Sequence, residues 1–386
     1  MIKNIKSIIK KNKLFLFVLV FNASGAIAAS MPVPAPPQVA AKNYLVLDFD
    51  SGRILAESKA DAKIEPASIT KLMTAYVVYH ELEAERLAMS DMVTISEKAW
   101  RMGGSRMYLE VGSKVTVKEL LKGLIVQSGN DASVALAEHV AGSEGAFVEL
   151  MNHYAAKLGM TGTHYKNSTG WPDDGHLTTA RDIATLSASI IREFPEHYTW
   201  YAEKAYTYNE IKQYNRNKLL WRDDTVDGLK TGHTESAGFC LVASAKRGEM
   251  RLISVVLGTK SMSARASVSQ SLLNYGFRFF ETHKLYTAGE TLNRSRVWQG
   301  EFEQVPLGLA EDLRITIPRG AYKNLEAFMD VNSDIEAPLK KGQRLGLVRI
   351  SLDNEELMSR PLVALEKIEE GNIFQVVKDY VLRMLN

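Results

Sequence analysis

Pro66-Ala67-Ser68-Ile69-Thr70-Lys71 stands immediately before an apolar run from Leu72 to Val78. A serine and a lysine three residues apart at the start of a helix lie on the same face. A serine hydroxyl needs an adjacent base to act as a nucleophile, and a lysine is such a base only when burial or a second cation keeps it neutral. The spacing therefore predicts Ser68 as a nucleophile and Lys71 as its base.

Two further motifs follow along the chain. Ser128-Gly129-Asn130 lies between two apolar helical stretches, and Lys230-Thr231-Gly232-His233 ends a strand-like segment. Each triplet alone is weak evidence, and Ser7-Ile8-Ile9-Lys10 repeats the Ser-x-x-Lys spacing near the N-terminus. The chain nevertheless has one Ser-x-Asn and one Lys-Thr-Gly, so the ordered set predicts one catalytic site around Ser68.

Length and composition indicate an exported, soluble globular protein of two domains. The 386 residues are 46% hydrophobic, and the formal net charge of +2 gives no footprint for binding nucleic acid. Five lysines, the apolar run Leu14 to Phe21 and Ala26-Ile27-Ala28 predict a signal peptide over 1–28, because the run is too short to span a bilayer. The single cysteine, Cys240, excludes an internal disulfide and is expected to be a buried apolar residue.

The order of predicted elements indicates an α/β domain followed by an all-β domain. A Pro- and Ala-rich tether over 29–41 leads into a hairpin from Tyr44 to Glu57, and strands return after Val226. Helices are expected between them, at Val117–Val126, Ala132–Ala141, Gly145–Leu158 and Thr179–Arg192, with a closing helix at Ser263–Thr282. Strands at both ends suggest one sheet that joins the two ends of this domain, 42–280.

The remainder of the chain changes character. Short alternating stretches such as Arg314–Ile317 and Leu345–Leu352 predict a small β-sandwich over 281–370, with Asp353-Asn354 at a hairpin tip. Residues 371–386 return to helical periodicity, with an apolar face and a polar face. We interpret this segment as an amphipathic helix on a membrane surface; the alternative is a terminal helix packed on the β-domain.

The three motifs match a signature of class A β-lactamases and penicillin-binding proteins, with Gly129 where that pattern has Asp. Beyond the motifs, the chain resembles the low-molecular-mass penicillin-binding proteins that are D-alanyl-D-alanine carboxypeptidases, over nearly everything after the signal. The stretches that carry the resemblance are Ile125–Ala132, Tyr214–Asn217, Leu229–Thr234 and Thr316–Gly320. It implies an α/β, transpeptidase-like domain of the serine β-lactamase and penicillin-binding-protein type with a helical subdomain, then the all-β domain and the amphipathic helix.

The resemblance also implies roles for the motif residues. Ser68 attacks the carbonyl between two terminal D-alanines of a peptidoglycan pentapeptide, Lys71 takes its proton, and Lys230 helps to keep Lys71 neutral. Ser128 relays a proton to the leaving amine while Asn130 orients it, and backbone N–H groups of Ser68 and His233 form the oxyanion hole. The expected substrate-binding residues are Thr231, Gly232, His233 and Arg216.

Arg216 is a possible second contact for the substrate carboxylate, and a structural salt bridge is an equal alternative.

The resemblance implies β-lactams as inhibitors and a site on the outer face of the inner membrane, in the periplasm. Neither a cofactor nor a metal is expected, since the eight histidines are scattered.

Alternative functions share the same motifs. A β-lactamase would need a glutamate after Ser-x-Asn to activate water, yet no Glu occurs from Met151 to Arg192. A non-catalytic scaffold is disfavoured by the complete set of motif residues. A D,D-endopeptidase or transpeptidase stays open, because only the leaving group or the acceptor differs.

Overall fold

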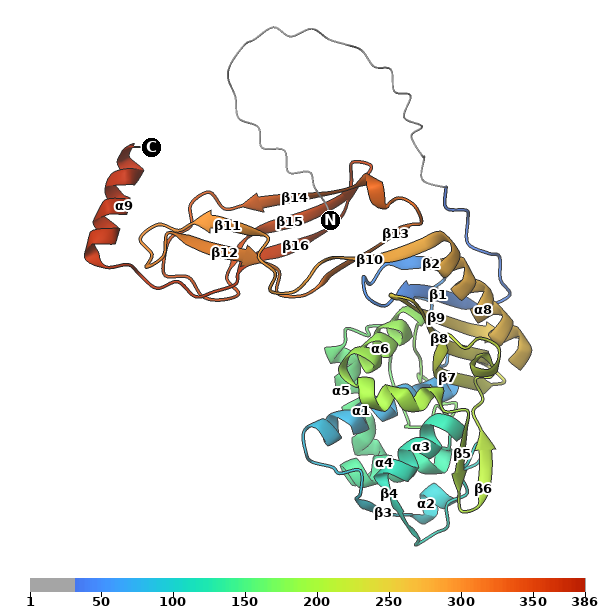
Figure 1. Ribbon diagram of the computed structural model, residues 1–386. Coiled ribbons are helices and arrows are strands. Elements are labelled where there is room, and N and C mark those ends of the chain that lie inside the picture. The colour runs from blue at the N-terminus through green and yellow to red at the C-terminus, as the bar shows by residue number, and fades with distance from the viewer. Residues whose placement is uncertain (1–31, 386) are drawn as a thin grey trace.

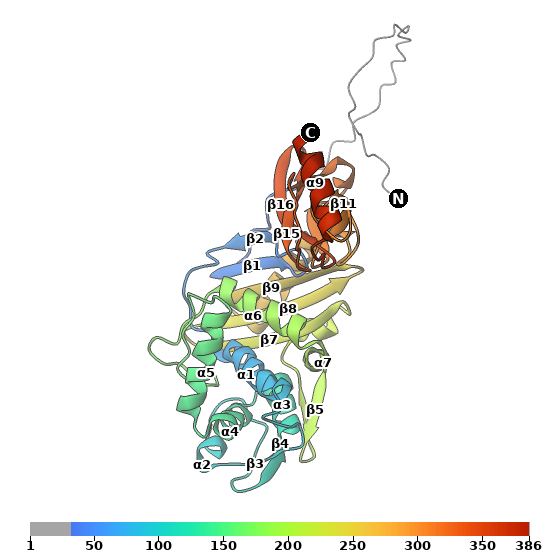
Figure 2. The ribbon, with the colours of Figure 1, turned by 90° about the vertical axis from the view of Figure 1, so that its left-hand side faces the viewer.

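The structure is a computed structural model that describes residues 32–385, so the expected signal peptide over 1–28 lies outside the described residues. An α/β part comes first and an elongated all-β part follows, with helix α9 (Ile373–Leu385) at the end farthest from the α/β part (Figures 1 and 2). This arrangement confirms the expected fold class.

A five-stranded antiparallel sheet forms the centre of the α/β part, in the order β2-β1-β9-β8-β7. Its strands are β1 (Asn43–Asp48), β2 (Ile54–Ser58), β7 (Val226–Thr234), β8 (Gly238–Arg247) and β9 (Met250–Thr259). The pairing of β1 with β9 joins the two ends of the domain, as the sequence predicted. Helix α8 (Met262–Phe279) packs on one face and α6 (Ala180–Glu193) on the other, which explains why most residues of the central strands β8 and β9 are buried.

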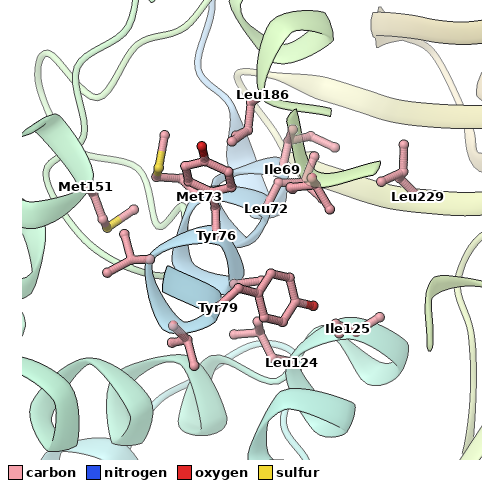
Figure 3. Close-up of a cluster of buried hydrophobic side chains, with 14 of the residues drawn as sticks. Ile69, Leu72, Met73, Tyr76, Tyr79, Leu124, Ile125, Met151, Leu186 and Leu229 are labelled. Atoms are coloured by element: carbon pink, nitrogen blue, oxygen red, sulfur yellow. The ribbon is translucent and has the colours of Figure 1, made fainter. Parts of the chain in front are cut away.

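Helix α1 (Lys71–Glu83) runs through the middle of the helical subdomain. Its residues from Lys71 to Tyr79 are all buried, which requires an apolar surface on every side of the helix. Figure 3 shows Met73, Tyr76 and Tyr79 of α1 among side chains from neighbouring elements, including Leu124 and Met151. The segment that follows Ser68 is therefore buried in the core of the helical subdomain.

Four predicted helices appear close to their expected bounds, with one informative difference. Thr179 caps α6 by accepting a hydrogen bond from the backbone N–H of Asp182, as expected. The expected helix Val117–Val126 instead ends as α-helix at Lys122 and continues as a π-helical turn, Gly123–Gln127. Such a wide turn is common at functional sites. The other elements are α2 (Glu97–Trp100), α3 (Val117–Lys122), α4 (Asn130–Ala141), α5 (Glu144–Lys157), α7 (Pro195–Tyr198), β3 (Met92–Thr94), β4 (Lys114–Thr116), β5 (Ala205–Tyr208) and β6 (Ile211–Tyr214).

The all-β part has a five-stranded sheet in the order β11-β12-β16-β15-β14 and a separate pair, β10 with β13. Apolar side chains from both sheets share one core. Asp353 and Asn354 have φ of 51° and 69° between β15 and β16, so they form the predicted hairpin tip. The strands are β10 (Phe280–Tyr286), β11 (Asn293–Arg296), β12 (Gln304–Gly308), β13 (Leu313–Pro318), β14 (Leu325–Val331), β15 (Arg344–Leu352) and β16 (Glu355–Ala364).

A network of polar side chains joins the two parts. The buried Asp48 of β1 accepts a 2.7 Å hydrogen bond from Thr282 of β10. Arg53 donates to the carbonyl of Thr316 at 2.6 Å. Arg319 donates to the carbonyl oxygens of Phe277, Arg278 and Phe280, and so caps the end of α8. The bonds of Thr282 to Asp48, of Arg53 to Thr316 and of Arg319 to Phe277 and Arg278 cross between the two parts and hold them together.

The segment expected to be a tether is packed along the α/β part where the structure describes it. Val33, Val39 and Ala41 lie against the core beneath α8. The hydroxyl of Tyr275 donates a 2.9 Å hydrogen bond to the carbonyl of Pro34. The α/β part therefore includes packed residues from near the start of the described chain.

Helix α9 rests on the β-domain through its polar face. Asp379 is buried and accepts hydrogen bonds from the backbone N–H of Gln299, at 2.7 Å, and from Arg296, at 3.2 Å. Lys378 pairs with Glu303, and Arg383 pairs with Asp334 and Glu336. Acidic side chains of the β-domain therefore hold the polar face of α9 against it.

The apolar face of α9 points away from the β-domain. Its large side chains are exposed, up to 83% for Phe374: Ile373, Phe374, Val377, Tyr380, Val381 and Met384. No helix among residues 32–385 is long and apolar enough to cross a membrane.

Candidate active site

Ser68 and Lys71 lie at the junction of a short 3-10 turn, Ala67–Thr70, with helix α1. The Ser68 side chain is half-buried, whereas Lys71 is only 1% exposed. Gly170, at φ +84°, passes so close to this turn that an added Cβ would overlap the carbonyl oxygen of Ala67. Gly170 therefore packs tightly against the turn, and Ser68 lines a cavity.

The ammonium of Lys71 uses three acceptors. It donates to the Ser68 hydroxyl at 3.3 Å, to Oδ1 of Asn130 at 2.7 Å and to the carbonyl of Thr169 at 2.6 Å. The pKa of Lys71 is lowered to about 7, mainly by burial; Asp131 opposes this lowering and Arg216 adds to it. Near neutral pH a large fraction of Lys71 is therefore unprotonated and able to accept a proton from Ser68.

Ser128 and Lys230 form a second serine–lysine pair. Lys230 donates to the Ser128 hydroxyl at 2.8 Å, and both side chains are buried. Ser128 ends the π-helical turn with a left-handed backbone, φ +68°, which aims its hydroxyl at β7. Burial lowers the pKa of Lys230 well below its usual value, and the positive charge of Lys71 adds to this.

The order of these causes differs from the sequence-based expectation. Burial or a second cation was expected to keep Lys71 neutral, with Lys230 helping. Burial is the main cause, and the contributing cation is Arg216. The repulsion between the two lysines instead lowers the pKa of Lys230, whose charged form is already destabilised by burial.

Asn130 connects Lys71 to the loop on the far side of the cavity. Its Nδ2 donates to the carbonyl of Gly103 at 2.7 Å while its Oδ1 accepts from Lys71. The next residue, Asp131, accepts hydrogen bonds from the backbone N–H groups of Met107 and Leu109 and is itself buried. The pair holds the loop that carries Gly103 against the start of α4.

A loop that carried no recognisable motif completes the setting of Lys71. The carbonyl of Thr169 accepts from Lys71, and that of Ser168 accepts from Thr74 and Ser133. Behind this loop His176 lies 3.0 Å from the Thr70 hydroxyl, and burial lowers the pKa of His176 to about 4. Backbone carbonyls leave no signature in a sequence, so only the fold reveals this contact.

Strand β7 forms one wall of the site with the expected substrate-binding residues. Thr231 is buried, and a Cβ on Gly232 would lie 3.1 Å from the carbonyl of Pro66, so only a small residue lets β7 approach the nucleophile turn this closely. The His233 ring is exposed and stacks on Phe239 with 3.9 Å between centroids. No carboxylate contacts that ring among the described residues, which gives the side chain no partner for general-base chemistry.

Two arginines add positive charge to the same wall. Arg216 lies at the rim of the cavity and makes no ion pair within residues 32–385, so the structural salt bridge is not found; partial desolvation lowers its pKa. Arg265, near the start of α8, was not predicted as a site residue because it belongs to no sequence motif. It is buried, donates to the carbonyls of Gly232 and Cys240, and has its pKa lowered to about 10 by burial.

These walls enclose a cavity of about 710 Å³. Among the residues that sequence reasoning selected, Ser68, Ser128, Asn130, Arg216, Thr231, Gly232 and His233 line it. Lys71 and Lys230 lie behind the serines to which they donate. One carboxylate, that of Glu235, is among the lining residues described, and none hydrogen-bonds Ser68 or Lys71.

Other expectations about chemistry concern a metal and a thiol. Residues 32–385 hold no group of three or more His, Cys, Asp or Glu side chains arranged to bind a metal ion. Cys240 is buried, and burial raises its pKa to about 11, so it behaves as the expected apolar residue.

Comparisons with known proteins cover most of the chain. The D-alanyl-D-alanine carboxypeptidase family model matches residues 30–261, and the model of the penicillin-binding protein 5 C-terminal domain matches 280–370. The D-alanyl-D-alanine carboxypeptidase DacC of Escherichia coli K12 is 46% identical over 95% of this chain and 93% of its own length.

Solved structures give the same result. Penicillin-binding protein 5 from Haemophilus influenzae superposes with a TM-score of 0.84 at 43% identity, covering 87% of this chain and all of that one. Penicillin-binding protein D2 from Listeria monocytogenes, in its ampicillin-bound form, gives a TM-score of 0.59 at 29% identity, covering 63% of this chain and all of that one. The chain belongs to the D-alanyl-D-alanine carboxypeptidase family of serine-type peptidases and has the penicillin-binding-protein fold.

Proposed function

We propose that this enzyme removes the terminal D-alanine from peptidoglycan pentapeptides through an acyl-enzyme on Ser68. The observation that carries the proposal is the contact between Ser68 and Lys71, a buried lysine with a pKa of about 7 placed 3.3 Å from a hydroxyl that faces a cavity. Lysine in this state is a competent general base near neutral pH.

Acylation follows from the arrangement of the two serine–lysine pairs. Neutral Lys71 takes the proton of Ser68 as its Oγ bonds to the carbonyl carbon between the two D-alanines. The backbone N–H groups of Ser68 and His233 stabilise the oxyanion, each donor supplying roughly 3–4 kcal/mol by analogy with other hydrolases. Ser128 passes a proton to the amine as the C–N bond breaks and D-alanine leaves. Lys71, neutral again once this proton has been passed on, then accepts a proton from water as the water oxygen attacks the ester carbonyl. The bond to Oγ of Ser68 breaks, Lys71 returns the proton to Ser68, and the shortened peptide leaves.

The positive wall of the cavity favours a substrate that ends in a carboxylate. Lys230, Thr231 and Arg216 are placed to receive that group, since Arg216 lies at the rim without an ion-pair partner in the described part of the chain. A carboxypeptidase uses this wall in every turnover. An endopeptidase or transpeptidase on the same residues is the second candidate, because a free C-terminal carboxylate also occurs on the donor strand of a transpeptidation.

β-Lactams are expected to act as inhibitors by acylating Ser68. Asp131 is the carboxylate whose charge acts on the pKa of Lys71. Its oxygens accept hydrogen bonds from the backbone N–H groups of Met107, Leu109 and Ala132. It is therefore not free to activate water, and the acyl-enzyme with a β-lactam should be long-lived.

We also propose a location for the enzyme, outside the cytoplasmic membrane and attached to its surface in the periplasm. The exposed apolar face of α9 supports this attachment, since Phe374 and Met384 are far more exposed than large apolar side chains normally are.

One experiment tests the proposed chemistry. The soluble enzyme is incubated with a peptide ending in D-Ala-D-Ala, free D-alanine is followed, and a parallel sample is labelled with a fluorescent penicillin. Wild type should release D-alanine and become labelled, and Ser68→Ala should do neither. Labelling that persists on Ser68→Ala would assign the nucleophile elsewhere.

A further inference from the structure

The proposed oxyanion hole is assembled from two separate elements. The N–H of Ser68 belongs to the 3-10 turn Ala67–Thr70, whereas the N–H of His233 belongs to β7. Groups that act on the reacting atoms must be held within about 0.5 Å of their productive positions, because a misplacement of about 1 Å can cost roughly 100-fold in rate. The rate of acylation therefore depends on what holds β7 against this turn.

The packing of Gly232 sets the distance between β7 and the turn. A Cβ added to Gly232 would lie 3.1 Å from the carbonyl oxygen of Pro66 and 3.1 Å from Cγ1 of Ile69. Close packing at one residue limits how near the strand comes, but it does not fix how the strand is rotated about that contact. A second contact is needed to place the end of β7.

Glu65 supplies this second contact with its carboxylate. Its Oε2 accepts a 2.5 Å hydrogen bond from the hydroxyl of Ser236, in the turn between β7 and β8. The hydroxyl of Thr234, the last residue of β7, lies 3.5 Å from the same oxygen. Glu65 stands directly before Pro66, whose ring restricts φ, so the carboxylate is attached to the nucleophile turn by a stiff link. One side chain thus joins the two elements that carry the oxyanion donors.

The turn after β7 is ordered around the same two hydroxyls. The Thr234 hydroxyl accepts a 3.0 Å hydrogen bond from the N–H of Ala237 and lies 3.2 Å from the Ser236 hydroxyl. Lys42 donates to the carbonyl of Ser236 at 3.0 Å. Because Thr234 follows His233 directly and lines the catalytic cavity, the position of this turn determines the position of the His233 N–H.

The contact of Glu65 has little value for the stability of the fold. Glu65 and Thr234 are half-buried and Ser236 is exposed, so water can replace each partner when the other is removed. Glu65 does not line the cavity, and it makes no hydrogen bond to Ser68 or Lys71. The placement of β7 therefore explains the contact better than stability does.

We propose that Glu65 is a positioning residue for the oxyanion hole, which holds the His233 N–H in place relative to Ser68 by binding the turn after β7. It touches neither the substrate nor the reacting atoms. This inference rests on the proposed acyl-enzyme chemistry and assigns part of the oxyanion stabilisation to a carboxylate outside the cavity.

The test measures Glu65→Ala by stopped-flow acylation with a chromogenic β-lactam, which separates the dissociation constant of the first complex from the rate constant of acylation. The rate constant should fall by about tenfold, a fraction of the roughly 10²–10³ lost when an oxyanion donor is removed altogether. The dissociation constant should stay within about twofold, because Arg216 and Thr231 still receive the carboxylate. The melting temperature should change by no more than about 2 °C.

A peptide boronic acid gives a second readout, since it forms a tetrahedral adduct on a serine and places an oxygen in the oxyanion hole. Its dissociation constant should rise in Glu65→Ala by the same factor by which acylation slows, as expected for a loss of transition-state stabilisation.

Two further variants separate positioning from a general defect. Glu65→Gln keeps an oxygen that accepts from the Ser236 hydroxyl, so it should retain more than about a third of the acylation rate. Ser236→Ala removes the donor and should slow acylation by a similar factor to Glu65→Ala. The double variant Glu65→Ala/Ser236→Ala should be no slower than Glu65→Ala, because both changes remove one interaction.

Glu57→Gln is the matched control, since Glu57 pairs with Arg181 and does not line the cavity. Its acylation rate should equal that of wild type. Normal acylation by a folded Glu65→Ala overturns the proposal, and so do losses that multiply in the double variant. Failure of the proposed activity is distinguishable, because wild type would then release no D-alanine from a peptide while acylation by the β-lactam would still test Glu65.

Discussion

Lys230 donates a 2.8 Å hydrogen bond to Ser128, and this pair stands beside the equivalent bond from Lys71 to Ser68. Both ammonium groups are buried in the same site, and burial lowers the pKa of each. Two neighbouring lysines cannot both carry a full charge there at low cost, so the site divides the tasks: one lysine acts on the nucleophile, the other on the proton relay.

The rate of acylation should depend on pH through Lys71. Its pKa is lowered to about 7, and only the neutral form accepts a proton, so kcat/KM should rise as pH increases through about 7 and fall tenfold per pH unit well below it. Stopped-flow acylation by a chromogenic β-lactam between pH 5 and 9 measures this limb. A flat profile across that range would exclude Lys71 as the base.

Lys71→Arg should lower the rate of acylation by at least ~100-fold, since a guanidinium stays protonated and cannot act as a base. The comparison needs a folded variant, which the melting temperature and circular dichroism report. Normal acylation at neutral pH by a folded Lys71→Arg would remove the lysine from the mechanism.

Arg216→Gln should raise KM for a peptide with a free C-terminal carboxylate by about tenfold, because an exposed guanidinium in contact with an anion contributes roughly 1–2 kcal/mol. Arg222→Gln is the control, as Arg222 is exposed and does not line the cavity. Steady-state release of D-alanine gives both values. Equal KM in the two variants would leave Arg216 without a role in binding the carboxylate.

The acyl-enzyme formed with a penicillin should persist long after the free drug is removed. Carboxylates are absent from the hydrogen bonds of Ser68 and Lys71 in the described chain, so the deacylating water lacks the carboxylate base that a β-lactamase uses. Mass spectrometry of the labelled enzyme at successive times measures the decay. Turnover of penicillin on the timescale of a β-lactamase would contradict this assignment.

Removal of residues 371–386 should release the enzyme from membranes and leave hydrolysis of a soluble peptide unchanged, since the residues lining the cavity all precede residue 280. A loss of about 1–3 kcal/mol in the stability of the β-domain should accompany it, because Gln299 loses Asp379 as the acceptor of its backbone N–H. Fractionation and a melting curve on the same protein give both results. A truncated protein that stays with the membrane would refute attachment through α9.

The motifs around Ser68, Ser128 and Lys230 predicted which residues the fold brings together, because each combines a chemically necessary side chain with a fixed local geometry. The contacts supplied by main-chain atoms were not predictable. Thr169 reaches Lys71 through a carbonyl that every residue possesses, and Gly170 matters for the side chain that it lacks. Their positions depend on how a distant loop packs, which no local pattern encodes.

Helix α9 illustrates a different limit. Its periodicity correctly separated an apolar face from a polar one, but periodicity does not say what lies opposite the polar face. The acidic partners Glu303, Asp334 and Glu336 come from loops and strand ends of the β-domain. Membrane-surface helix and packed helix were posed as alternatives, and the structure shows a helix that packs by one face and leaves the other bare.

The hydrogen bonds of Asp48, Arg53 and Arg319 across the domain junction make the β-domain a stiff arm. With α9 seated on a bilayer, a stiff arm sets the height of Ser68 above the lipid, whereas a flexible one would let the site sweep a wide volume. Removal of D-alanine would then be confined to a thin layer of the cell wall at a constant distance from the membrane. The distance from the membrane at which peptides are cleaved would then be set by the length of the β-domain.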